Sequence, residues 1–451
     1  MKKPNLKAID PEVYEILKSE EEKQQYKLSM IASENFASKA VREAVGSVFM
    51  NKYSEGYPGA RYYEGNYNID NLENLARERT HKLFSLPDDW GVNVQAHSGS
   101  PANLAVYIAL LAPGDKLMGM YLPDGGHLSH GWSYEPKSKS DPDDPEYLGG
   151  SRKVNITSIF FDTVQYKTDP KTRQFNYDEV ERIAVKHKPK LIITGGTAYP
   201  REIDYKRVKA IAQKVGAYYL ADIAHEAGLI AGGVNKSPVG IADVITLTTH
   251  KTLRGNRGAI IMAKEELMKK IDRAIIPGLQ GGPHNHSIAG IAVALKEATQ
   301  PEFKEYSRQV VLNAQELAKK LIKNGLDIVT GGTDKHLILV DLTKSGVFGK
   351  KAARALDHAG IITNMNTMPQ ETRSPANPSA LRIGTPWITT RGMQEKEMGL
   401  IADWIAEVIE AIKAHQDLKF SEFEELVKKD ATVKKIAGEV KKLTQKFPLE
   451  I

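Results

Sequence analysis

Short apolar segments alternate with longer helical patterns along residues 92–262, and this alternation limits the possible folds of the 451-residue chain more than any other feature. Helical patterns occupy Asn103–Leu111, Tyr177–His187 and Tyr205–Val215. Such an order is typical of an α/β fold with a mostly parallel central sheet flanked by helices. The predicted strands are Val92–Gln95, Lys116–Tyr121, Ser158–Phe161, Lys190–Thr194, Tyr218–Ala221, Val244–Thr248 and Ala259–Met262.

The predicted secondary structure differs before and after residues 92–262. Asp10 and Pro11 are typical of a helix cap and a first helical position, which predicts a polar helix to about Lys27. A long helical region is predicted around His286–Lys323. We expect an N-terminal helical arm over residues 1–30, a large domain over 31–300 and a small C-terminal α+β domain over 301–451. The small domain is indicated by strand-like His336–Leu342, helix-like Lys350–Ala359 and strand-like Ala380–Ile383.

Two further segments have a distinct pattern. The lysine-rich run Glu422–Lys446 carries apolar residues at helical spacing, which predicts an amphipathic surface helix. The segment Ser133–Ser151 is polar and rich in proline, serine and aspartate, so we expect a surface insertion there.

The composition excludes several classes of chemistry. The chain has no cysteine, so disulfides, thiolate nucleophiles and cysteine-based zinc sites are impossible, and we expect no metal site. A net charge of +6 is small for this length and its basic residues are dispersed, which does not favour nucleic-acid binding. The N-terminus lacks the apolar core of a secretion signal, and no apolar run approaches the ~18 residues of a membrane span. We therefore expect a cytoplasmic protein.

Two predicted strands end in residues that suggest covalent cofactor chemistry. Lys251 follows the strand Val244–Thr248, and Asp222 ends the preceding strand, 251 − 222 = 29 residues earlier. A desolvated lysine can form an imine with an aldehyde cofactor. Pyridoxal 5′-phosphate (PLP) also needs an anion at its pyridine nitrogen, and Asp222 would supply it. The alternatives are a loop lysine that reaches solvent, a helix-capping aspartate and, for the nearby His225, a buried structural histidine.

A third segment is suited to a phosphate group. The run Ser98-Gly99-Ser100-Pro101 follows a predicted strand and opens an apolar helix. Ser100 is predicted to cap this helix and Pro101 to occupy its first position. Helix N-termini bind phosphate through free N–H groups and the helix dipole, although many helices begin in this way without binding an anion.

Several longer runs resemble the serine hydroxymethyltransferase family, which consists of fold-type-I PLP-dependent transferases. The resemblance covers nearly the whole chain. Its motifs are Ser33–Asn35, Asn51–Gly59, Arg61–Tyr63, Ser98–Asn103, Leu122–Leu128, Thr248–Arg254, Leu279–His284 and Leu381–Pro386.

The resemblance implies a cofactor site and an assembly. Lys251 would carry PLP, Asp222 would pair with the pyridine nitrogen, and His127 would stack on the ring. His225 would lie near the 3′-oxygen, and His250 would also contact the cofactor. The phosphate would be bound by Ser98, Gly99 and Ser100, and by Tyr53, Gly281 and Gly282 of a second subunit in a homodimer or a dimer of dimers.

The resemblance also implies how the substrates bind. Serine and glycine would be held by Arg382 and Ser33, because a guanidinium grips a carboxylate with two hydrogen bonds. Glu55 of the second subunit would act in proton transfer, with Tyr63 near the substrate. Tetrahydrofolate, as co-substrate, would contact Leu122, Gly126, Leu128 and Asn366.

The chain departs from the usual family pattern at a few positions. Glu226 stands where a small or apolar residue is usual, and Pro200 replaces a usual serine. Glu64 and Tyr67 depart near the expected subunit interface, and Ala376 stands where an aromatic residue is common. None of these removes a group that the chemistry requires. The sequence leaves open the type of pterin and the choice between dimer and tetramer.

Overall fold

The computed structural model describes residues 5–134 and 152–451, and a seven-stranded sheet lies at its centre. Four of the strand pairings are parallel, and β12 is antiparallel to both of its neighbours. In spatial order the strands are β4 (Trp90–Asn93), β12 (Ala259–Lys264), β11 (Val244–Thr248), β10 (Tyr218–Asp222), β9 (Leu191–Thr194), β5 (Lys116–Met120) and β8 (Asp162–Tyr166). The predicted α/β class with a mostly parallel sheet is confirmed.

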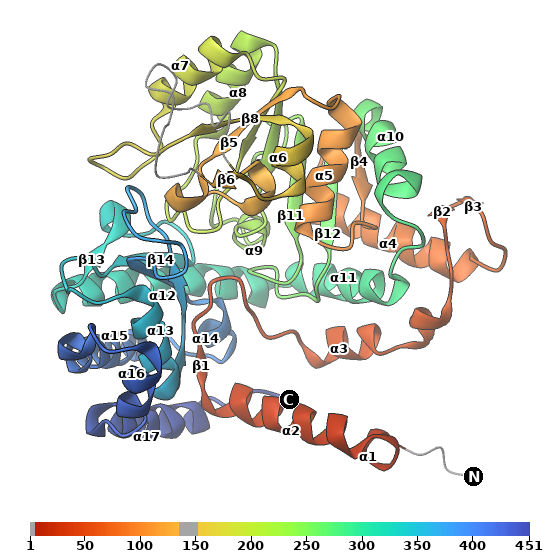
Figure 1. Cartoon of the computed structure of the whole chain (residues 1–451). Coiled ribbons are helices and arrows are strands. Elements are labelled where there is room, and N and C mark those ends of the chain that lie inside the picture. Colours follow the sequence, from red (N-terminus) through yellow and green to blue (C-terminus); the bar gives the residue numbers. More distant parts are fainter. Residues whose placement is uncertain (1–4, 135–151) are drawn as a thin grey trace.

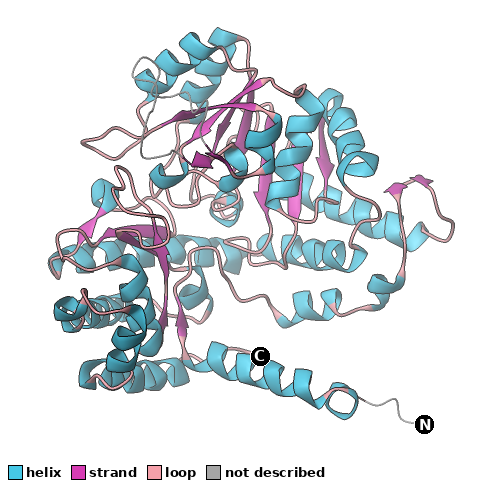
Figure 2. Ribbon diagram, viewed as in Figure 1, coloured by secondary structure: helices cyan, strands magenta, loops and turns pink. Residues whose placement is uncertain are grey.

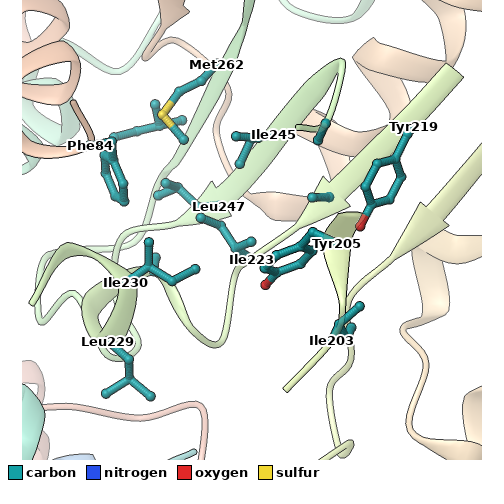
Figure 3. Close-up of a cluster of buried hydrophobic side chains, with 14 of the residues drawn as sticks. Phe84, Ile203, Tyr205, Tyr219, Ile223, Leu229, Ile230, Ile245, Leu247 and Met262 are labelled. Carbon is teal, nitrogen blue, oxygen red and sulfur yellow. The ribbon is translucent and has the colours of Figure 1, made fainter. Parts of the chain in front are cut away.

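Helices cover both faces of this sheet, so its strands are buried at nearly every position (Figures 1 and 2). Adjacent residues along a strand enter different cores: Leu220 of β10 belongs to one cluster, and Tyr219 and Ala221 belong to the other. Figure 3 shows the second of these clusters, where Ile245 and Leu247 of β11 meet Met262 of β12. The covering helices include α4 (Tyr67–Leu83), α5 (Gly99–Leu110), α7 (Tyr177–His187), α8 (Tyr205–Val215), α9 (Ala227–Ala231) and α10 (Glu265–Arg273).

A smaller α+β domain follows, as predicted. Its four-stranded sheet has the order β13 (Asp327–Ile328), β14 (Leu337–Asp341), β17 (Ala380–Gly384) and β16 (Asn364–Asn366). The helical region before it consists of α11 (Asn285–Ala298) and α12 (Pro301–Lys323), which run along the base of the large sheet in Figure 1. The domain's helices include α13 (Gly349–His358), α14 (Pro386–Thr390), α15 (Glu395–Ala411), α16 (Phe420–Val427) and α17 (Ala431–Lys446).

The N-terminal segment packs against the small domain. Helix α2 (Pro11–Tyr26) is capped by Asp10, whose carboxylate accepts a hydrogen bond from the Val13 amide, as the sequence suggests. Strand β1 (Leu28–Ser29) then pairs in parallel with β15 (Ile361–Ile362), and Leu28 lies in the small-domain core. The expected boundaries at residues 30 and 300 stay predictions. Among the described residues, no helix has the length and apolar character of a membrane span.

Two predictions of secondary structure are wrong. Ser158–Phe161 is not a strand, because Asn155 caps a short helix, α6 (Ile156–Phe160), and the strand β8 begins only at Asp162. The run Glu422–Lys446 is not one helix, because α16 ends at Val427 and Asp430 caps a new helix, α17. The predicted insertion Ser133–Ser151 lies outside the described residues except at Ser133–Tyr134.

We expect Gly228→Ala to destabilise the large domain. A Cβ at Gly228 in α9 would lie 2.2 Å from the backbone oxygen of Thr252, and neither backbone can move freely in this packed region. Overpacking of this kind costs about 1–3 kcal/mol in the free energy of unfolding. Denaturant unfolding of the variant measures this loss.

Gly438→Ala is the matched control. This glycine lies inside helix α17, and nothing is within 4 Å of its Cβ position. Alanine should therefore stabilise that helix by about 0.5–1 kcal/mol. Equal effects of the two substitutions would contradict the packing described at Gly228.

Candidate active site

A cavity of about 320 Å³ lies where the carboxyl ends of the parallel strands meet the start of α5. This edge of an open α/β sheet is the usual place for a ligand. Sequence-predicted residues from five separate segments come together in its lining: Ser33, Ser98, Gly99, Ser100, His127, Asp222, His225, His250 and Lys251.

Asp222 occupies the last position of β10 and pairs in register with Thr246 of β11. One carboxylate oxygen, Oδ2, accepts hydrogen bonds from Asn103 Nδ2 at 2.8 Å and His130 Nε2 at 3.0 Å. Burial opposes ionisation of this carboxyl, but the hydrogen bond from His130 and the neighbouring histidines outweigh it and hold the pKa well below its usual range. Asp222 is therefore a fixed anion at the cavity.

Lys251 follows β11 and is 8% exposed. Burial lowers the pKa of its ammonium from 10.5 to about 8, against the opposing effect of the Asp222 carboxylate. Roughly a tenth of the amine is thus unprotonated at pH 7, far more than for an ordinary lysine, and this is the form that attacks an aldehyde. The cavity places this nucleophile beside the Asp222 anion.

Helix α5 presents its N-terminus to the same cavity. It begins at Gly99, with Ser98 as the N-cap, and the Ser98 side chain makes no capping hydrogen bond. The prediction that Ser100 caps this helix is wrong, because the helix starts two residues before Pro101 and Ser100 already lies in the first turn. A Cβ at Gly99 would lie 2.8 Å from Thr248 Cγ2, so a larger residue would crowd the approach to the free amides. This geometry suits a phosphate group.

Three histidines around the cavity are neutral. Burial lowers the pKa of His127 to about 4 and that of His250 to about 3, and it holds the pKa of His225 well below its ordinary value. His225 Nε2 and His250 Nδ1 are buried without a hydrogen-bond partner in the described part of the chain. Buried polar atoms normally have partners, so these two atoms fit a polar group bound in the cavity.

One cluster of described residues has the geometry of a metal site. Ligand atoms of His127, His130 and Asp222 all lie within 4.8 Å of one another. The pair His130–Asp222 is already hydrogen bonded, and His127 Nδ1 lies 2.8 Å from Ser129 Oγ. His130 is therefore already bonded to the Asp222 carboxylate, and His127 to Ser129. The expectation of no metal stays a prediction.

Arg382 approaches the cavity from the small domain. Its guanidinium donates to the Thr197 carbonyl at 2.6 Å and hydroxyl at 3.0 Å, and it lies 3.5 Å from Ser33 Oγ. Thr197 and Ser33 both line the cavity, although Arg382 itself is behind them. Burial lowers the pKa of Arg382 only to about 10, so the side chain remains a cation at neutral pH.

A second group of predicted residues lies together outside this cavity. The Tyr53 and Tyr63 rings are 5.2 Å apart in an edge-to-face arrangement. Tyr53 also lies against Gly282, and Glu55 Oε1 is 3.2 Å from the Cβ position of Gly281. Tyr53 and Tyr63 are 56% and 41% exposed. These five residues form one surface cluster, and none of them is among the residues that line the Lys251 cavity.

The predicted pterin contacts are divided between two places. Leu122, Gly126 and Leu128 lie in the loop after β5 that carries His127, and Leu128 is 49% exposed. Leu128 also lines a second cavity of about 430 Å³ with Leu279 and Gln280. Asn366 lies at the end of β16 in the small domain, where it pairs with Ala380.

Sequence reasoning missed several groups at the cavity. Thr197 follows β9 at the same sheet edge as Asp222, so the rule that identified Asp222 would also have indicated it. His130 and Asn103 support Asp222, but they come from segments 92 and 119 residues away, and no local pattern marks them. The remaining lining residues that were not predicted are Glu34, Gly196, Ala224, Thr248 and Arg257.

The fold and this cavity define a fold-type-I PLP-dependent enzyme. The donor set fits the cofactor: a lysine of lowered pKa for the aldehyde, a buried carboxylate for the pyridine nitrogen and a helix N-terminus for the phosphate.

The family model described as serine hydroxymethyltransferase matches residues 6–405. A protein named serine hydroxymethyltransferase from Acidothermus cellulolyticus is 50% identical over 98% of this chain and 96% of its own length. Proteins of the same name from Sorangium cellulosum and Rickettsia prowazekii are each 48% identical over 98% of this chain, covering 96% and 98% of their own lengths. The chain belongs to the serine hydroxymethyltransferase family.

The lowered pKa of Lys251 predicts how attachment of PLP depends on pH. In the cofactor-free protein, the rate of covalent attachment should rise with pH and level off above about 8, because only the unprotonated amine attacks the aldehyde. An ordinary exposed lysine would instead remain mostly protonated until about pH 10.4.

Borohydride trapping at timed intervals, followed by peptide mapping, measures this rate. Lys251→Ala is the control and should yield no adduct on the corresponding peptide. A rate that still increases steeply at pH 10 would contradict the lowered pKa, and an adduct on a different lysine would contradict the assignment of Lys251.

Proposed function

We propose that this chain catalyses the reversible PLP-dependent conversion of serine and tetrahydrofolate to glycine and 5,10-methylenetetrahydrofolate. The observation that carries the proposal is the single cavity where Lys251 and Asp222 lie together, with the Arg382 guanidinium held directly behind its wall. Family membership supports the same reaction. The expected cytoplasmic location is part of this proposal.

Five residues of the cavity have a defined task in the proposed reaction. Lys251 holds PLP covalently, and the bound cofactor supplies an electron sink for the bond between the α-carbon and the hydroxymethyl group. Asp222, kept ionised by His130 and Asn103, holds a proton on the pyridine nitrogen. His127 would lie over the ring of the cofactor, while His225 and His250 offer ring nitrogens that have no other partner in the described residues.

The amino-acid substrate is oriented by the small domain. Arg382 and Ser33 bind the α-carboxylate of serine or glycine, and the two parallel hydrogen bonds of the guanidinium fix its orientation as well as its charge. Thr197, which accepts two hydrogen bonds from Arg382 Nη1, keeps the guanidinium facing the cavity.

A second copy of the chain completes the site in this proposal. The cluster of Tyr53, Glu55, Tyr63, Gly281 and Gly282 is assembled on one surface and lies outside the Lys251 cavity of its own chain. We infer that it serves the cavity of another subunit. Glu55 then transfers protons at the substrate hydroxyl and the pterin, while Tyr53 and the two glycines bind the phosphate. The assembly is a homodimer or a dimer of dimers.

The pterin binds beside the loop that carries His127. Leu122, Gly126 and Leu128 supply apolar and backbone contacts, and Asn366 supplies a polar side chain from the small domain. The second cavity, lined by Leu128 and Leu279, offers additional space next to this loop.

An assay of glycine formation tests the reaction class. We expect turnover of serine by the PLP-loaded protein to require tetrahydrofolate and to yield equal amounts of glycine and the one-carbon product. Cleavage of 3-hydroxy amino acids without any requirement for the pterin would indicate a pure aldolase. Absence of both reactions in a protein that binds PLP would contradict the proposed function.

Hybrid dimers test the shared site. Glu55→Ala and Lys251→Ala chains are each expected to be inactive, but a mixed dimer has one cavity with both residues intact. Activity should therefore return when the two variants exchange subunits. A mixture of Lys251→Ala with Arg382→Ala is the control, because both residues belong to the same cavity and no mixed site is intact. Equal recovery in the two mixtures, or none in the first despite exchange, would contradict the shared-site proposal.

Arg382→Lys should lower kcat/KM for serine while leaving PLP bound. Lysine keeps the charge but cannot form two parallel hydrogen bonds with a carboxylate. Loss of a charge-assisted hydrogen bond costs about 1.5–3 kcal/mol, which corresponds to roughly ten- to a hundredfold in kcat/KM. Steady-state kinetics and the visible spectrum of the bound cofactor measure the two effects.

Arg391→Lys is the matched control for this substitution. Arg391 is also buried, and its guanidinium donates to backbone carbonyls of Gln24, Gln25, Thr444 and Phe447, none of which lines the cavity. Its replacement should reduce thermal stability without changing serine kinetics. Near-normal serine kinetics in Arg382→Lys would remove Arg382 from the substrate site.

A further inference from the structure

A buried ion pair connects the two domains close to the cavity. Glu226 Oε1 accepts a hydrogen bond from Lys335 Nζ, and each residue is only 2% exposed. The Lys335 ammonium also lies over the Tyr199 ring, 5.6 Å from its centre. Taking two charges out of water is costly, and such a pair is often no more stable than an apolar replacement. Its presence therefore needs a reason other than stability.

Glu226 is anchored to the loop that carries Lys251. It precedes α9, four residues after Asp222. The Thr252 hydroxyl donates to the His225 carbonyl at 2.8 Å and accepts from the Gly228 amide at 2.9 Å. The segment that carries Glu226 is thus bonded on both sides to the residue that follows Lys251.

Lys335 is anchored to the strand pair that carries Arg382. Residue 335 lies two positions before β14, and β14 pairs with β17 so that Leu339 is opposite Arg382. His336, next to Lys335, lies 3.0 Å from His225 through Nε2 and Nδ1, with the two rings stacked. The Asp334 amide donates to the Pro200 carbonyl at 3.0 Å. Residues 334–336 therefore hold the small-domain sheet against the large domain.

We propose that the Glu226–Lys335 pair is a positioning device that fixes the distance and angle between Arg382 and Lys251. The inference rests on the proposed role of Arg382 in binding the substrate carboxylate. A buried ion pair has one favourable geometry, whereas apolar side chains tolerate sliding at a domain junction. Lys335 is the partner that makes a buried carboxylate acceptable at position 226.

The charges around His336 explain why Glu226 and Lys335 must both be present. Burial, and after it the Lys335 ammonium, hold the pKa of His336 well below its ordinary value. The groups that face His336 are the Lys335, Lys251 and Arg382 cations, and His225 beside it is neutral as well. Glu226 is the anion in contact with Lys335. Removing it leaves the Lys335 ammonium without a counter-ion, close to the Arg382 cation.

The experiment compares Glu226→Leu, Lys335→Met and the double variant in the full-length, PLP-loaded protein. Each single variant strands one buried charge, so its melting temperature should fall clearly. The double variant leaves no buried charge without a partner, so it should recover most of the lost thermal stability. In the double variant, the KM for serine should remain raised by about tenfold, with a smaller change in kcat, because the domain alignment is no longer specified. The visible spectrum of the bound cofactor should be unchanged.

Lys209→Met is the matched control. Lys209 forms a partly buried ion pair with Asp243 at 2.6 Å, within the large domain alone. Its loss should lower thermal stability without changing the KM for serine. The double variant decides the outcome even if the single variants do not fold. If the double variant has the wild-type KM for serine, the Glu226–Lys335 pair has only a structural role and the inference is overturned. If wild-type protein and Lys209→Met both fail to bind serine, the proposed function itself is wrong.

Discussion

The parallel pairing of β10 with β11 is the constraint on which the rest of the site depends. It places Asp222 opposite Thr246, so the chain leaves both strands at the same edge of the sheet. Lys251 then enters the cavity only a few residues beyond β11, beside the carboxylate. The pairing itself is held by burial on both faces: Val244 and Leu220 enter one core, while Ile245 and Ala221 enter the other. A slip by one residue would exchange these faces and remove Asp222 from the site.

Burial also gives the site its electrostatic character. It keeps His127, His225 and His250 neutral and lowers the pKa of Lys251, while Asp222 stays ionised because His130 and Asn103 donate to it. Desolvation disfavours the charged form of both groups. The Lys251 amine therefore loses its proton more easily, whereas the Asp222 carboxylate stays ionised because it accepts hydrogen bonds. A carboxylate without these two donors would gain a proton in such surroundings. The support for Asp222 is thus as necessary as the carboxylate.

Local patterns in the sequence were sufficient for the sheet and for the two residues at its edge. They failed where capping overrides an apolar run: Asn155 turns the expected strand Ser158–Phe161 into a helix, and Asp430 divides the predicted C-terminal helix. The family resemblance supplied Arg382 and the surface cluster around Glu55. Neither source indicated that Lys335 is the partner of Glu226, because the two residues are 109 positions apart and meet only when the domains pack together.

In the proposed assembly, one chain carries two parts of the site, and these parts come together only between subunits. The Lys251 cavity is built by the carboxyl edge of the sheet, whereas Glu55 and Gly281 lie in a separate, partly exposed cluster. In the proposed assembly each subunit supplies one half to its partner, so catalysis requires association. The relative position of the two domains within each chain then matters for catalysis. A second subunit can complete a cavity only if the large and small domains around that cavity are already correctly oriented. A specific bond between the domains, such as the Glu226–Lys335 pair, meets that requirement within the chain, before any partner arrives.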